Sequence, residues 1–188
     1  MDRGQNRAVF LDRDGVINKA VVIDGKPYPP ASMEEFEICL HVKEGLETLS
    51  AAGFLNIVVT NQPDVRTGKQ SRAVVDDFHC RLKSELPIDD IYVCFHIDGD
   101  NCDCRKPQPG MLLCAAEKWS IDLERSFMLG DRWKDIEAGE RAGCTTFWLP
   151  AGYAEPEPKA PDFVVGSLLE ASQHILKENE STILRSGQ

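Results

Sequence analysis

Two aspartates, Asp12 and Asp14, follow a short apolar stretch at residues 8–11 and are separated by a single residue. In an extended chain, side chains two positions apart leave the same face, so these two carboxylates are expected to lie close together. Two close carboxylates repel one another unless a cation, a shared proton or water lies between them. The pair therefore predicts either a metal site or acid–base chemistry at the end of this strand.

Other polar side chains follow the later apolar stretches in the same way. If those stretches are strands of one parallel sheet, their carboxyl ends share one edge, which is where ligands bind in open α/β sheets. We expect a set of acids, one hydroxyl group and basic side chains to converge there, comprising Thr60, Asn61, Arg105, Lys106 and Asp131. Asp135 follows Asp131 by one helical turn.

The elements that must position this set alternate along the chain. Residues 54–60 form a mainly apolar run of strand length, and Val74, Phe78 and Leu82 recur on one face of a predicted helix. Strands are expected at 8–11, 54–60, 91–95, 126–130, 145–149 and 162–165, and helices at 42–53, 71–86, 109–119, 135–143 and 167–178. This alternation predicts the α/β class, with a doubly wound parallel sheet and helices on both faces.

The connecting segments divide into surface loops and candidate functional loops. Residues 18–35, 61–70 and 96–108 each follow a predicted strand and are longer than most connections, which is typical of loops with a function. The Pro-rich segment 151–161 is expected to be a surface loop. The sequence predicts one domain over residues 1–180 and a flexible tail over 181–188.

Composition limits the classes of function. The chain has 188 residues and a net charge of −10, which argues against a broad nucleic-acid surface. No apolar run approaches the roughly 20 residues of a membrane span, and the N-terminus lacks the apolar core of a signal peptide, so a cytoplasmic location is expected. The odd count of seven cysteines predicts no disulfide framework. Four of them are expected to be small core residues, namely Cys39, Cys80, Cys114 and Cys144.

The other three cysteines gather near a histidine. Cys94, His96, Cys102 and Cys104 lie within eleven residues, and thiolates with imidazole suit a tetrahedral Zn²⁺ ion. Four protein ligands would close the site, so we expect a structural zinc in residues 94–104. Its position predicts that the metal folds the loop and aims the following Arg105 and Lys106.

Four motifs now stand in a fixed order: DxDGVIN, TNQ, RKP and GDxxxD. In this order, each after a predicted strand, they resemble the haloacid-dehalogenase superfamily of phosphohydrolases. The zinc loop directly before RKPxPGM resembles the branch of D-glycero-D-manno-heptose 1,7-bisphosphate phosphatases and histidinol-phosphate phosphatases. The resemblance spans residues 8 to about 165 and implies a Rossmann-like core.

The resemblance implies a role for each motif residue. Asp12 would be the nucleophile that becomes an aspartyl-phosphate, and Asp14 the general acid and base. Thr60 would hydrogen-bond the phosphoryl oxygens, while Lys106 would bridge the nucleophile and the phosphate. Asp131 would hold a catalytic Mg²⁺ with Asp12 and the backbone carbonyl of Asp14. Charge neutralisation of this kind lets a carboxylate attack an anionic phosphate.

Substrate recognition is less constrained by the motifs. Asn61 and Arg105 are candidate substrate-binding residues, because a guanidinium group can grip a second anionic group. Arg132 could do the same or be an exposed charge, and Asp135 could support the metal or be structural. The intervals between motifs leave no room for a separate cap domain. Two segments depart from the heptose branch, at residues 18–32 and 62–69.

The sequence thus predicts a Mg²⁺-dependent phosphatase for a small phosphorylated sugar, without a nucleic-acid or membrane partner and acting as a monomer. D-glycero-D-manno-heptose 1,7-bisphosphate, losing its 7-phosphate, is the leading substrate. Histidinol phosphate or another small sugar phosphate is the alternative. Two non-enzymes remain: a zinc-stabilised interaction module, and a phospho-accepting signalling domain, whose acceptor aspartate follows the third strand rather than the first.

Overall fold

A computed structural model describes the backbone of residues 5–186 and the side chains up to residue 178. Its centre is a sheet of six strands in the order β5-β4-β1-β6-β7-β8, and every neighbouring pair is parallel. The strands are β1 (Arg7–Leu11), β4 (Phe54–Asn61), β5 (Asp90–Cys94), β6 (Phe127–Gly130), β7 (Thr145–Trp148) and β8 (Phe163–Val164). The predicted parallel sheet is confirmed, and each strand end lies within one residue of the predicted one.

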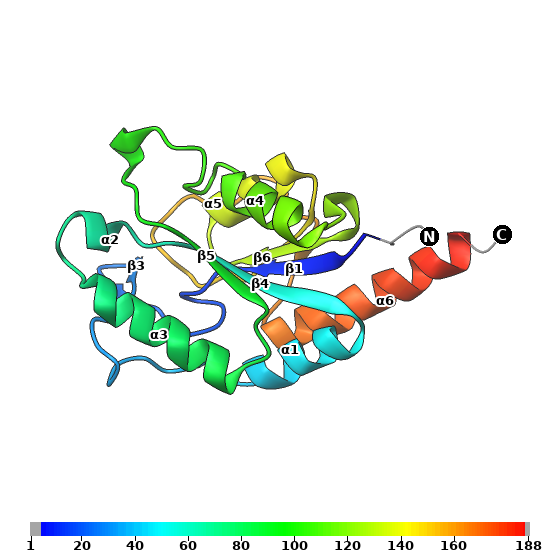
Figure 1. Cartoon of the computed structure of the whole chain (residues 1–188), viewed down its shortest axis with the longest axis horizontal. Coiled ribbons are helices and arrows are strands. Elements are labelled where there is room, and N and C mark those ends of the chain that lie inside the picture. The colour runs from blue at the N-terminus through cyan, green and yellow to red at the C-terminus, as the bar shows by residue number, and fades with distance from the viewer. Residues whose placement is uncertain (1–4, 187–188) are drawn as a thin grey trace.

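Helices cover both faces of this sheet (Figure 1). Helices α1 (Val42–Ala51), α3 (Arg72–Glu85) and α6 (Leu168–Ser186) contribute to one core cluster, and α4 (Gly110–Trp119) and α5 (Trp133–Ala142) to the other. The doubly wound α/β class is therefore confirmed.

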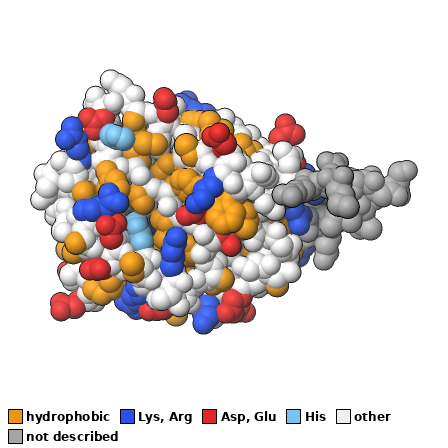
Figure 2. Space-filling model, viewed as in Figure 1, with side chains coloured by type: hydrophobic (Ala, Val, Ile, Leu, Met, Phe, Trp, Pro, Cys, Tyr) orange, Lys and Arg blue, Asp and Glu red, His pale blue; other side chains and the backbone are white. Residues whose placement is uncertain are grey.

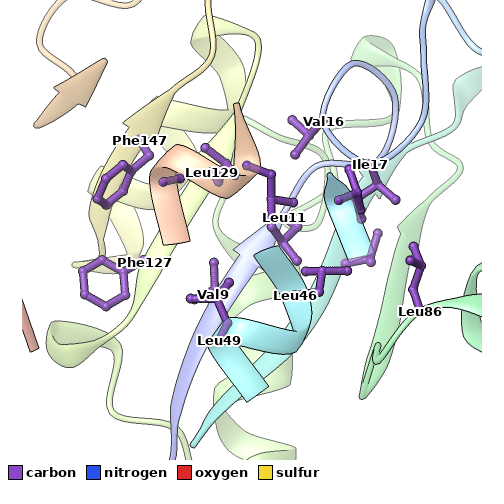
Figure 3. Close-up of a cluster of buried hydrophobic side chains, with 14 of the residues drawn as sticks. Val9, Leu11, Val16, Ile17, Leu46, Leu49, Leu86, Phe127, Leu129 and Phe147 are labelled. Atoms are coloured by element: carbon purple, nitrogen blue, oxygen red, sulfur yellow. The ribbon is translucent and has the colours of Figure 1, made fainter. Parts of the chain in front are cut away.

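Strand β1 is buried on both faces because its alternate side chains enter different cores. Val9 and Leu11 pack with Leu46 and Leu49 of α1, as Figure 3 shows, whereas Phe10 belongs to the cluster on the opposite face. Each fully buried aliphatic or aromatic side chain of this size contributes about 1.5–3 kcal/mol. This double burial fixes the register of β1, and with it the position of the aspartates that follow.

The long loops contain short elements that the sequence did not predict. A hairpin of β2 (Val21–Ile23) and β3 (Lys26–Tyr28) lies in the segment after β1, and helix α2 (Pro63–Arg66) follows β4. The hairpin turn is Asp24–Gly25, with positive φ angles of 49° and 73°. An Asp-Gly pair between strand residues is a strong signal for a two-residue turn of this kind, so the hairpin could have been predicted.

Helix α6 is longer than the sequence predicted. It runs to Ser186, whereas a helix ending at residue 178 and a flexible tail over 181–188 were expected. Residues 179–186 contain neither glycine nor proline, so no helix-breaking residue occurs before Gly187. The expected tail is therefore helical up to Ser186, and residues 187–188 lie outside the described part of the chain.

All seven cysteines are free thiols, as the odd count predicted. Cys144 is buried and Cys39 is half-buried, but Cys80 and Cys114 are exposed. The prediction of a core position was wrong for these last two, because they lie on the solvent-facing sides of α3 and α4. A residue on a helix is expected to be buried only when it lies three or four positions from other buried apolar residues, not merely next to an apolar residue in the sequence.

The surface carries charges of both signs. On the face shown in Figure 2, basic and acidic side chains are interspersed over the helices, with apolar atoms between them. Among the described residues, no helix has the length and apolar character needed to cross a bilayer.

Candidate active site

The carboxyl ends of β1, β4 and β6 bring the sequence-predicted residues together. Asp12 directly follows β1, and its backbone N–H donates to the carbonyl of Leu129 on β6 at 3.0 Å. Thr60 and Asn61 end β4, and Asp131 follows β6. Strand β1 pairs with β4 on one side and β6 on the other, up to the residue before Asp12. The expected convergence of these side chains is present.

Lys106 lies at the bottom of this group and joins two carboxylates. Its ammonium nitrogen is 2.6 Å from Asp12 Oδ1 and 2.6 Å from Asp135 Oδ1, and it donates to the carbonyl of Val59 at 2.7 Å. Only 2% of the side chain is exposed. Burial lowers the pKa of Lys106, but the charges of Asp12 and Asp135 outweigh it and raise the pKa above its ordinary value. The side chain therefore remains a fixed positive charge.

Three buried carboxylates lie close together near the single positive charge of Lys106. Oxygens of Asp12, Asp131 and Asp135 all lie within 4.8 Å of one another, and Asp131 Oδ1 is buried without a hydrogen-bond partner. Burial raises the pKa of Asp12 to about 6 despite Lys106, and burial with the charges of Asp12 and Asp135 raises that of Asp131 well above its ordinary value. Excess buried negative charge and an unused oxygen fit a hard divalent cation such as Mg²⁺.

Asp135 is the residue whose role the sequence left open. It is 2% exposed, pairs with Lys106, and accepts a hydrogen bond from the backbone N–H of Arg132 at 3.0 Å. It is therefore part of the charged cluster and not a solvated helical acid. Its contacts place it where it can hold Lys106 and stand beside a cation at Asp12 and Asp131.

The loop after β1 passes close to this cluster at Gly15. Its φ angle is +94°, and a Cβ atom there would lie 1.8 Å from Asp131 Oδ2. No other residue type fits without moving the carboxylate. The glycine of the DxDG motif thus allows the Asp14 segment to pass beside Asp131.

The carboxylate of Asp14 is held apart from the other three by donors. Arg13 Nη2 lies 2.9 Å from Oδ2, Asn18 Nδ2 is 2.9 Å from Oδ1, and Gln62 Nε2 is 2.7 Å from Oδ2. Asp14 is absent from the carboxylate group that could share a cation, which is compatible with a ligand role through its backbone carbonyl alone. These three donors fix the position of the Asp14 carboxylate in the wall of the pocket.

Arg13, the residue between the two aspartates, is wholly buried. Besides pairing with Asp14, its Nη1 atom is 3.2 Å from His79 Nε2 on α3, and its guanidinium group lies over the ring of Phe78. Burial, together with the charge of Arg13, lowers the pKa of His79 to about 4. His79 is therefore neutral near pH 7 and can accept the hydrogen bond from Arg13.

This contact predicts a specific dependence of stability on pH. As the pH falls below the unfolded pKa of 6.5, the unfolded chain binds a proton that folded His79 refuses until about pH 4, so the folded state loses stability across that interval. Between pH 7 and pH 5 the free energy of unfolding should fall by about 2 kcal/mol more in the wild type than in His79→Gln. Urea unfolding of both proteins in Mg²⁺-free buffer measures this, and equal losses would contradict the assignment.

Thr60 and Asn61 have different surroundings. Thr60 Oγ1 accepts a hydrogen bond from Gln62 at 3.1 Å and lines the pocket. The amide of Asn61 is engaged on both atoms by the backbone of Lys106, at 3.0 and 3.1 Å. Its contacts thus point to fixing the Lys106 segment, whereas the sequence assigned it to substrate binding.

A pocket of about 310 Å³ opens above the cluster. Besides the catalytic candidates it is lined by the β3 hairpin strand and by residues of all three long loops. Arg105, Arg132 and Lys134 also line it. Arg105 Nε binds Asp98 at 2.6 Å, while its Nη1 atom is buried without a partner. The pocket wall therefore has three cations besides Lys106, and each has a carboxylate neighbour, Asp98 for Arg105 and Lys134 and Glu155 for Arg132.

The predicted zinc ligands are gathered into one group. The Sγ atom of Cys104 is 3.2 Å from that of Cys94, 3.5 Å from that of Cys102 and 3.3 Å from His96 Nδ1. A tetrahedron with metal–sulfur bonds of about 2.3 Å has edges of about 3.7 Å, so the donor set and its spacing fit Zn²⁺. Cys104 directly precedes Arg105 and Lys106, which joins the candidate zinc site to the active-site loop.

Two residues that contact the site, Gln62 and Tyr153, were not predicted from the sequence. Gln62, the last residue of the TNQ motif, binds both Asp14 and Thr60. Tyr153, in the loop after β7, donates to Asp131 Oδ2 at 2.7 Å. For Gln62 the motif itself was a signal, since a buried amide beside a predicted carboxylate needs a partner. Nothing in the Pro-rich loop sequence marked Tyr153.

The chain is similar in sequence to known phosphatases. Residues 103–171 match a family model described as HAD-hydrolase-like. The D-glycero-alpha-D-manno-heptose-1,7-bisphosphate 7-phosphatase of Photorhabdus laumondii is 36% identical over 188 residues, covering 93% of this chain and 100% of that protein. The D-glycero-beta-D-manno-heptose-1,7-bisphosphate 7-phosphatase of Escherichia coli K12 is 33% identical, covering 92% and 95% respectively.

A solved structure shows the same similarity. The crystal structure of D,D-heptose 1,7-bisphosphate phosphatase from B. bronchiseptica, complexed with magnesium and phosphate, matches with a TM-score of 0.78 and 26% identity. The match covers 92% of this chain and 99% of that chain. Sequence and structure comparisons therefore indicate one group of proteins.

Proposed function

This chain belongs to the D-glycero-D-manno-heptose-1,7-bisphosphate 7-phosphatase family of HAD-type hydrolases and is a phosphoric monoester hydrolase, and on that premise we propose that it removes the 7-phosphate from a heptose 1,7-bisphosphate. Relatives are named for both the alpha and the beta anomer, so the proposal covers the sugar and not its anomer.

The observation that carries the proposal is the charge distribution in the pocket. Asp12 and Lys106 lie on one part of its wall, and Arg105, Arg132 and Lys134 line it as well. A substrate with two phosphates matches a reacting centre together with a second cationic group. Histidinol phosphate offers a cation where the bisphosphate offers an anion, which favours the bisphosphate over this alternative.

Asp12 and Asp14 divide the reaction between them in this proposal. A carboxylate oxygen of Asp12 attacks phosphorus, the bond from phosphorus to the sugar oxygen breaks, and protonated Asp14 gives its proton to that oxygen. Asp14 then takes a proton from water, which attacks the aspartyl-phosphate and releases phosphate, restoring Asp12. The donors Arg13 and Gln62 hold the Asp14 carboxylate in place for both proton transfers.

The other residues prepare the charges for these steps. Lys106 and Thr60 would bind the phosphoryl oxygens, with Asn61 and Asp135 holding Lys106. Mg²⁺, held by Asp12, Asp131 and the backbone carbonyl of Asp14, would supply neutralisation of the phosphate charge when bound. Magnesium is supported by the B. bronchiseptica neighbour, and structural zinc at the Cys94 group remains a proposal from the donor set.

A substrate panel tests the function. With Mg²⁺, kcat/KM should be highest for the heptose 1,7-bisphosphate anomers, lower for sugar monophosphates and lowest for histidinol phosphate, and EDTA should abolish turnover of every substrate, including an aryl phosphate. A preference for histidinol phosphate or a monophosphate would overturn the substrate. Absence of Mg²⁺-dependent hydrolysis across the whole panel would overturn the enzymatic mechanism.

Arg105→Met sharpens this test because it keeps the apolar stem and removes the forked donor. We expect kcat/KM to fall about 10–100-fold for the bisphosphate, as befits loss of a charge-assisted contact, and less than about threefold for the corresponding 7-monophosphate. An equal fall in kcat/KM for both substrates would mean that Arg105 binds the reacting phosphate or supports the loop, and does not bind a second phosphate.

Four narrower statements remain predictions. We propose a single catalytic domain over residues 1–180 with its zinc loop at 94–104, and action as a monomer. A cytoplasmic location and the lack of a nucleic-acid substrate also rest on the sequence alone.

A further inference from the structure

Three consecutive residues of the loop after β7 contact three different parts of the active site. We call residues 153–155 the strap. The hydroxyl group of Tyr153 binds Asp131, the N–H of Ala154 donates to the carbonyl of Gly25 at 2.7 Å, and Glu155 pairs with Arg132. None of these strap residues has a part in the reaction described above.

The two carboxylate oxygens of Asp131 have different surroundings. Tyr153 donates to Oδ2 at 2.7 Å, while Oδ1 is buried and has no hydrogen-bond partner. One oxygen is therefore fixed by the protein, and the other is left for a cation.

The strap is itself anchored at the two residues that follow Tyr153. At the first, Gly25 has a φ of +73°, and a Cβ atom there would approach that of Ala154 within 2.8 Å. At the second, Arg132 Nε lies 2.8 Å from Glu155 Oε2, with a second contact between the same two side chains. These contacts with the hairpin tip and with Arg132 limit the freedom of the adjoining tyrosine to swing away from Asp131.

We propose that Tyr153 is a positioning residue for the metal site, orienting Asp131 so that its free oxygen binds Mg²⁺. This rests on the proposed function only in taking Asp131 as a Mg²⁺ ligand. Hydrogen bonds that orient a ligating carboxylate usually contribute 10–100-fold to metal affinity. Trp148 supports the same residue by donating to the carbonyl of Asp131 at 3.2 Å.

The test is Mg²⁺ affinity, measured by calorimetry on protein freed of Mg²⁺ by gel filtration without a chelator. In Tyr153→Phe the Kd for Mg²⁺ should rise about tenfold, while kcat at saturating Mg²⁺ and the KM for sugar phosphate stay within about threefold of wild type. The matched control is Tyr92→Phe, which removes a buried hydroxyl group on β5, outside the pocket, and should leave the Kd unchanged.

A purely structural tyrosine would give a different pattern. In that case Tyr153→Phe would lower the melting temperature without Mg²⁺, yet its Mg²⁺ Kd would stay within twofold of wild type, and this result overturns the proposal. If Asp131→Asn loses Mg²⁺ binding while Tyr153→Phe keeps it, only this inference fails. If the wild type itself binds no Mg²⁺, the proposed function fails too.

Discussion

Asp12→Asn should lower kcat by at least about a thousand-fold and leave the fold unchanged. An amide of the same shape cannot attack phosphorus to form an acyl-phosphate, and it offers Lys106 no negative charge. Lys106 would keep its pair with Asp135 at 2.6 Å, so the buried ammonium group is not left alone. Steady-state phosphate release in saturating Mg²⁺, with circular dichroism as the check on folding, measures both parts of this expectation.

The control for this variant is Asp77→Asn, which removes an exposed carboxylate on α3. It should retain wild-type kcat, since surface substitutions away from the site have small effects. An Asp12→Asn protein with more than a tenth of wild-type activity, purified beside this control, would refute Asp12 as the nucleophile.

The second large effect concerns the zinc loop. Purified protein should contain about one zinc per chain, and Cys104→Ser should lose most of it. Because Cys104 contacts all three other ligands and precedes Arg105 and Lys106, its loss should lower the free energy of unfolding by at least about 3 kcal/mol. Activity should fall about 10–100-fold as Lys106 loses its support.

Cys114→Ser provides the comparison, because Cys114 is an exposed free thiol on α4. It should keep its zinc, its stability and its activity. Elemental analysis, urea unfolding and kcat/KM are measured for all three proteins. A fully active wild-type preparation without zinc would show that the four-residue group does not hold a structural metal.

The fold was predictable from the sequence because strand and helix patterns agreed along the whole chain. The run at 54–60 has the length and the β-branched residues of a buried strand, and Phe78 and Leu82 indicated the inner face of α3. The β2–β3 hairpin was not predicted because its three-residue strands are too short to show a periodic pattern, although the sequence contains its Asp-Gly turn. The end of α6 was misplaced because a polar segment was taken for a tail.

The site was predictable where a motif places a residue at a strand end. Asp12, Asp131 and Lys106 meet because parallel strands end at one edge of the sheet. Asp135 could not be assigned from sequence, since a helical acid one turn from a motif is exposed or buried according to the packing of α5. Tyr153 could not be found because its contact depends on how a loop folds across the sheet.

The contacts of Asp14 could not be predicted from its motif. The motif places this carboxylate two residues after Asp12, but it does not show that Arg13, Asn18 and Gln62 all donate to it. The contact with Arg13 depends on the burial of Arg13 against α3, which the letters DRD do not reveal. The structure thus adds the donors that fix the orientation of the Asp14 carboxylate.

The measurement that tests the account most directly is chemical trapping of the covalent intermediate. Enzyme mixed with a sugar phosphate and Mg²⁺ is quenched in acid within milliseconds, reduced with borohydride and mapped by peptide mass spectrometry. We expect reduction of an acyl-phosphate at Asp12 to homoserine, only in samples given substrate and not in Asp12→Asn. Homoserine at another aspartate, or none at all while burst kinetics show an intermediate accumulating, would contradict it.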